Sequence, residues 1–289
     1  MSLFDFNFYS GDVHGESPSS MMEFFKIIGG AIFGIAVTKG YEWLGDKKRI
    51  KRSGTDLINE VLLLEEPIKK QVESVNNLIV LLKEEKTNIP QLTVSHSLNT
   101  SRIKEINRSD VVKYFEGHYG NRKMSRKKVN QIYVSLDIIY YNHEQTKILF
   151  NSFLERGMIC LQKCKESTDK MAHTIASYQS ELQKRGVKIE SDNLIYQLSL
   201  LFKTTFKQEE SVDFILIKNS FYGQVSKILN DNRTDDRVSP ISALSYNCNE
   251  AIKEYENLKK EIIFKFSKIN ESLEEQMEDL IEYTKEFNN

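Results

Sequence analysis

A cluster of basic side chains around a glycine-flanked turn is the part of this sequence best suited to bind a ligand. Residues 117–128 read GHYGNRKMSRKK, and the turn is expected to lead into a helix N-terminus. Backbone donors, the helix dipole and neighbouring cations together favour a bound anion there. The predicted binding residues are Arg122, Lys123, Arg126, Lys127 and Lys128, with His118 and Tyr119 as stacking surfaces for a nucleotide or single-stranded nucleic acid. A solvated loop and a patch attracted to anionic lipid are the alternatives.

A second string with chemical potential lies near the N-terminus. Residues 11–15 read GDVHG, which resembles the GDxHG element of metallophosphoesterases, where an Asp and a His bind a metal ion that activates water. That family also carries GDxxD and GNH[DE] elements, and the nearest string here is TDDR at residues 234–237. A hydrolase that uses Asp12 and His14 is therefore a third, disfavoured function.

The cysteines indicate neither a disulfide framework nor a metal centre. There are three, Cys160, Cys164 and Cys248, all within helical patterns, and an odd number favours a reducing compartment. Cys160 and Cys164 lie one helical turn apart, but no second pair of ligands follows at a fixed spacing. With no phosphate-binding loop and no nucleophile-elbow sequence, we predict no enzymatic activity, no metal and no cofactor.

The elements that position these residues are predicted to be long helices. The chain has 289 residues but only 4 prolines and 13 glycines, too few breakers for a many-stranded sheet. Its net charge of -1 argues against a protein that coats nucleic acid over its whole surface. We predict an all-α protein.

Apolar stripes at helical spacing define the expected helices. One stripe runs over residues 57–82 and contains Pro67, which predicts a kink or two abutting helices. A second runs over 125–185, unbroken or broken near Asn142 or Gly157, and a third follows Ser239 to the C-terminus. Ser109, Ser191 and Ser239 are the expected N-caps, and loops are expected near 87–100, 117–125, 186–192 and 231–239. The expected architecture is a long-helix bundle or coiled coil.

Residues 24–44 are predicted to form a transmembrane anchor. The uncharged run at 27–38 is bracketed by Lys26 and Lys39 and makes about 18 Å of helix, so spanning about 30 Å of hydrocarbon requires snorkelling lysines and interfacial aromatics. A buried or interfacial helix is the alternative. The basic residues that follow are predicted to lie at the cytoplasmic face of the membrane: Lys47, Lys48, Arg49, Lys51 and Arg52. This predicts a single-pass protein of the plasma (inner) membrane, with an acidic tail at 1–23 outside and a cytosolic domain at 45–289.

Small residues in this segment predict self-association. Gly29, Gly30 and Gly34 would let helices approach closely, so we expect a homo-oligomer. The predicted function is an oligomeric membrane effector whose helical domain controls anchor packing, forming a pore in response to a nucleotide, oligonucleotide or protein partner. In layout the chain resembles the single-anchor helical effectors of bacterial anti-phage defence, which implies a companion enzyme or its nucleotide signal. The alternative is a passive membrane tether or coiled-coil scaffold.

Overall fold

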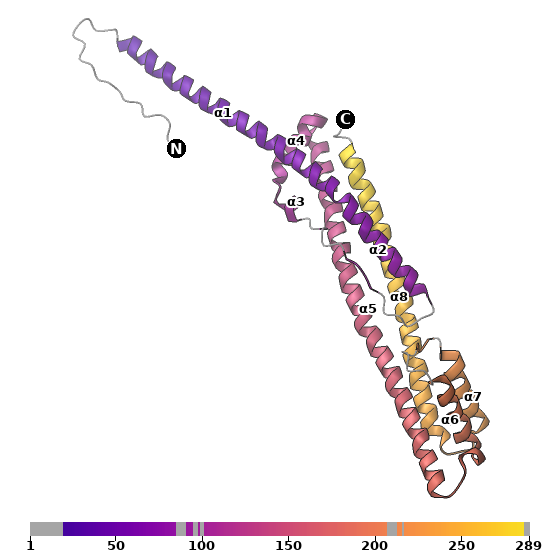
Figure 1. Ribbon diagram of the computed structural model, residues 1–289. Helices are drawn as coiled ribbons and strands as arrows, with labels where there is room; N and C mark the ends of the chain where they lie inside the picture. The colour runs from indigo at the N-terminus through magenta and orange to yellow at the C-terminus, as the bar shows by residue number, and fades with distance from the viewer. Residues whose placement is uncertain are drawn as a thin grey trace.

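The described residues form an elongated rod whose regular secondary structure is helical throughout. The computed structural model describes residues 20–84, 91–94, 98, 101–206, 213–215 and 217–285, and no β-strand occurs among them. The axis of the rod is α5 (Arg122–Lys184), which is unbroken and therefore about 95 Å long. It packs antiparallel against α8 (Val238–Lys285) along most of that length (Figure 1). The predicted all-α fold is confirmed.

Two hydrophobic cores are arranged one after the other along the rod. We call the first the arm-proximal core, in which α2 (Glu65–Lys83), α3 (Ser101–Glu105), α4 (Arg108–Tyr119) and the end of α1 (Ser20–Leu63) pack on α5 and α8. The second is the distal core, formed where α6 (Asn193–Thr205), a π-helical turn at Lys218–Tyr222 and α7 (Gly223–Asp231) cover the other end. Because α5 and α8 contribute to both cores, the two cores belong to one continuous body.

A disulfide bond lies inside the distal core. Cys164 on α5 and Cys248 on α8 are bonded, both fully buried, while Cys160 remains a buried free thiol. The prediction that the cysteines form no disulfide is wrong. Helical spacing within one segment does not reveal which residues of another helix lie opposite, and Cys164 and Cys248 are 84 residues apart in the sequence.

The helix ends differ in detail from the prediction. Asn107, not Ser109, caps α4 by accepting from the backbone amides of Ser109 and Asp110, at 2.9 and 3.3 Å. Asp192, not Ser191, caps α6 through the amide of Ile195. Each predicted serine has an Asn or Asp within two residues of it, and these side chains cap a helix as well as serine does. The sequence pattern therefore does not decide which of the two is the cap. The last helix begins at Val238, one residue before the predicted cap.

The turns between helices are shorter than predicted. The loop expected at 117–125 is only the pair Gly120 and Asn121, because Gly120 closes α4 with a φ of 63° and Asn121 caps α5. The break predicted at Pro67 is confirmed: α1 ends at Leu63 and α2 begins at Glu65, so the proline sits in the first turn, where its missing amide costs little. Part of the loop expected at 87–100 lies outside the described residues.

The N-terminal half of α1 projects beyond the end of the rod (Figure 1). We call residues 25–49 the arm, because every side chain in this range is exposed. Within the described part of the chain, no helix combines the length and apolar character needed to cross a bilayer. The predictions of a transmembrane anchor at 24–44 and of a single-pass membrane protein are therefore wrong. The uncharged run is 12 residues long and holds three glycines, so its hydropathy falls below that of a span.

Candidate functional sites

The arm carries apolar side chains that the rest of the described chain leaves uncovered. Six large apolar side chains of the uncharged run are exposed, with Ile27 and Phe33 the most accessible at 72% and 71%. They point in all directions around the helix, since successive residues are turned by about 100°. No atom from elsewhere in the described structure lies within 4 Å of a Cβ built on Gly29, Gly30 or Gly34. The glycine surface predicted to pack against other copies is thus open.

A tight crossing fixes the arm to the rod. Gly54 of α1 is buried against the ring of Tyr114 on α4, so closely that a Cβ at residue 54 would overlap the ring. One turn away, the Arg49 guanidinium donates to the buried carboxylate of Asp110 at 2.8 Å, and this hydrogen bond raises the pKa of Arg49. The arm therefore leaves α4 along a fixed direction.

Three of the five basic residues predicted to face a membrane contact other side chains of the protein, although all five are exposed. Arg49 pairs with Asp46 as well as with Asp110, and Arg52 lies 3.5 Å from Asp56. The Lys47 ammonium sits 5.1 Å from the centre of the Trp43 ring. The predicted position of these residues at a membrane surface followed from the transmembrane anchor, and it loses its basis because that prediction is wrong.

Three of the predicted anion-binding residues come together in a groove at the end of the rod nearer the arm. We call this the cationic groove; it has a volume of about 560 Å³ and lies between the start of α5 and the end of α8. Lys123, Arg126 and Lys127 line its α5 side. The remaining lining residues are Asn130, Gln131, Val134 and Ser135 of α5 and Gln276, Asp279 and Tyr283 of α8.

The other predicted residues do not line the groove. Arg122 is 4.0 Å from Glu116, and the Lys128 ammonium lies 4.8 Å from the centre of the Tyr283 ring. His118 stacks on Tyr114, and Tyr119 packs against the arm-proximal core. The predicted stacking surfaces are thus engaged on α4, away from the three grouped cations.

The groove also contains residues that sequence reasoning missed. The α8 wall is more than 140 residues away along the chain, so nothing near the basic turn could identify it. Arg108 of α4 donates to the Asn130 side chain at 2.7 Å, which brings another cation to the groove edge. The one available signal was the helical stripe of the last helix, which predicts its packing on α5 but not the meeting of their ends.

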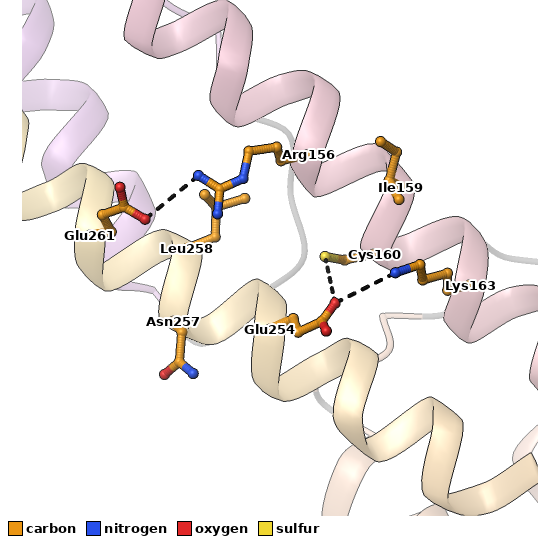
Figure 2. Close-up of a pocket in the computed structure, with 8 residues that line it drawn as sticks. All are labelled: Arg156, Ile159, Cys160, Lys163, Glu254, Asn257, Leu258 and Glu261. Carbon is orange, nitrogen blue, oxygen red and sulfur yellow. Dashed lines mark hydrogen bonds and ion pairs between the residues drawn. The ribbon is translucent and has the colours of Figure 1, made fainter.

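A second hollow lies halfway along α5 and α8. Figure 2 shows Cys160 and Lys163 directed toward Glu254, and Arg156 toward Glu261. The cations lie 3.8 Å from Glu254 and 3.6 Å from Glu261, while the Cys160 sulfur is 3.9 Å from Glu254. Burial, followed by the nearby Glu254 carboxylate, raises the pKa of the Cys160 thiol. The thiol is therefore protonated at neutral pH, and the opposite charges offset one another across the hollow.

Neither a metal site nor a similarity to known proteins assigns a function to this chain. Within the ranges that the structure describes, no group of three or more His, Cys, Asp or Glu side chains could hold a metal ion. Asp12 and His14 lie outside those ranges. No family model, curated protein or solved structure matches this chain.

Proposed function

We propose that this protein is a self-associating helical scaffold, in which the arms of three or more copies pack into a bundle and the rods project from it. The observation that carries the proposal is the exposure of every side chain in the arm. Large apolar side chains exposed all around a helix favour a partner that covers them, because exposed apolar surface is unfavourable in water. The rod does not cover them, since the arm extends past its end (Figure 1).

The amount of apolar surface on the arm fits contact between copies. Ten large apolar side chains of the arm are exposed: Phe25, Ile27, Ile28, Ile32, Phe33, Ile35, Val37, Tyr41, Trp43 and Leu44. At on the order of 100 Å² each, they offer roughly 1,000 Å², compared with about 800 Å² per partner in a stable interface. The exposed apolar area of the arm is therefore large enough for a stable interface between copies.

The distribution of that surface favours a bundle over a pair. Two helices in contact cover one face of each, but Ile27, Ile28 and Phe33 lie on different sides of the arm. Covering them needs at least two neighbours per helix. The open glycines permit close backbone approach on one of these faces.

The rigid attachment of the arm supports a structural role. Because Gly54 and Arg49 hold α1 against α4, a bundle of arms would set the directions of all the rods that leave it. The rods would then present their distal ends at a distance from the centre. Such an arrangement is typical of a scaffold, which holds attached partners apart.

Sedimentation equilibrium tests the assembly. We expect wild-type protein to form an oligomer of at least three copies, and Phe33→Glu to raise its dissociation constant at least tenfold, since burying an added charge at the centre of a bundle is costly. Phe264→Glu is the matched control, because Phe264 lies on α8 and is 64% exposed. It should leave the oligomer intact.

A second variant separates specific packing from non-specific adhesion. Gly30→Leu adds apolar surface, so it should strengthen a non-specific aggregate but weaken a bundle that needs close backbone contact. A monomeric wild type, or equal losses in Phe33→Glu and Phe264→Glu, would refute the proposal. So would flotation of monomeric protein with lipid vesicles through the arm, because lipid would then be what covers it.

A further inference from the structure

The cationic groove has a chemistry of its own that is independent of self-association. We propose that it binds a compact anion with two or three linked phosphates, as found in a nucleoside triphosphate or in inorganic triphosphate. Three cations without an ion pair among the described residues, neutral donors and a suitable volume support such a ligand, and the acidic second wall disfavours larger polyanions.

The three cations of the groove lack ion-pair partners among the described residues. Lys123, Arg126 and Lys127 make no salt bridge with any residue that the structure describes, although Asp279 lines the same groove. This is unlike other basic residues nearby: Arg122 has Glu116, and Lys104 has Asp137. Positions three and four apart on a helix are neighbours, so the like charges repel. A bound anion would relieve that repulsion.

The helix N-terminus is not what would hold the anion. Asn121 accepts from the backbone amides of Lys123 and Met124, at 2.9 and 3.2 Å, and so uses donors that sequence reasoning reserved for a ligand. Binding must therefore depend on side chains. Lysine supplies three N–H donors and arginine five, which suits phosphate oxygens with several lone pairs.

Neutral donors and volume indicate a small ligand. The side chains of Gln131 and Gln276 line the groove, and Asn130 is fixed there by its hydrogen bond from Arg108. A volume of about 560 Å³ falls within the range of small-molecule sites, roughly 300–1,000 Å³. A polyphosphate could lie along the cations while the amides bond to whatever it carries.

The α8 wall opposes long or flat polyanions. Asp279 lines the groove, and the exposed acids Glu275, Glu278 and Glu282 lie near it on the same helix. An anionic membrane or an extended nucleic-acid strand would approach these carboxylates as well as the cations. A compact anion can contact the α5 side and leave the acidic helix in solvent. For this reason we favour a small polyphosphate over lipid and nucleic acid.

Isothermal titration of the full chain with inorganic triphosphate and with ATP tests the site. We expect both to bind, with Arg126→Gln weakening binding about tenfold as one charge-assisted hydrogen bond is lost. The triple variant of Lys123, Arg126 and Lys127 to Gln should abolish measurable binding. A matched triple variant of Lys253, Lys265 and Lys268 to Gln removes the same charge from α8 and should bind as wild type.

The two ligands distinguish two forms of the proposal. Equal affinity means that the phosphates alone are recognised, whereas tighter binding of ATP means that the amides contact the nucleoside. The proposal is overturned if neither binds at about 1 mM, or if the α8 control weakens binding as much as the groove variant. Tighter binding of a short single-stranded oligonucleotide or of phosphatidylserine vesicles through the same cations would also overturn it.

Discussion

Replacing Gly54 with alanine should loosen the crossing of α1 over α4. A Cβ on residue 54 would overlap the root of the Tyr114 ring, a part of the side chain that cannot move without shifting the backbone or changing rotamer. Overpacking of this kind costs about 1–3 kcal/mol. Alanine recovers up to about 1 kcal/mol in helix propensity, which leaves a net loss of up to about 2 kcal/mol.

Gly117→Ala is the matched control for this substitution. Gly117 also lies in a helix, α4, but no atom is within 4 Å of the position that its Cβ would take, so only the propensity gain applies. Urea unfolding followed by circular dichroism should show the two variants moving in opposite directions. In a thermal melt each kcal/mol corresponds to a shift of about 2–4 °C for a chain approaching this size.

A double variant shows whether the Tyr114 ring is the cause. Tyr114→Ala removes the ring, so Gly54→Ala should cost nothing, or become stabilising, in that background. The difference between the two backgrounds is the coupling energy, expected at about 1–3 kcal/mol. If Gly54→Ala is as stabilising as Gly117→Ala in the wild-type background, the crossing is not tight and the fixed direction of the arm is refuted.

Three further predictions concern the distal core. In urea unfolding, Cys164→Ser should lower stability by about 3–5 kcal/mol in oxidising buffer, because the lost disulfide closes a loop of 84 residues, and no such loss should occur in reductant. The loss caused by Cys160→Ser, which removes only a free thiol, should be the same with and without reductant. Burial raises the pKa of Tyr222 to about 12, so the tyrosine ionises at a lower pH in the unfolded chain than in the folded one. The free energy of unfolding should therefore fall by about 2–3 kcal/mol between about pH 10 and 12, and pH-dependent melts should show a smaller fall in Tyr222→Phe. Asp192→Ala should cost about 1 kcal/mol more than Asp192→Asn in urea unfolding, because asparagine keeps the cap on α6 and alanine does not; equal costs would assign the effect to the ion pair with Arg237.

The helical architecture could be predicted because its signals are local. The stripe from Val129 to Phe153 repeats at the helical period and contains no proline or glycine, so a helix could be predicted there. The sequence leaves open whether that helix continues through Gly157, and α5 is unbroken. Pro67 marked the boundary between α1 and α2 for an equally local reason. In both cases the residues that decide the structure are within a few turns of one another.

Two of the errors arose where distant residues decide the outcome, and a third arose from the hydropathy of one short segment. The Cys164 to Cys248 bond and the α8 wall of the cationic groove depend on how α5 and α8 align, which no short window reports. The transmembrane prediction relied on Lys26 and Lys39 to extend a short apolar run, and that extension added length without adding hydropathy. The cations of the groove could be predicted because they lie close together in the sequence. Its α8 wall could not be predicted, because it lies far from them along the chain.

The unbroken pairing of α5 with α8 constrains how the chain could change in length. Adding residues to one helix alone would slide its apolar stripe past its partner, so both must grow together. Seven residues in each would lengthen the rod by about 10.5 Å and turn its far end by only about 20°. Two residues in each would turn each helix by roughly 160° about its own axis, so the apolar stripes of α5 and α8 beyond the insertion would no longer face each other. Insertions near whole heptads would therefore change the length of the rod, whereas shorter ones would disrupt its packing.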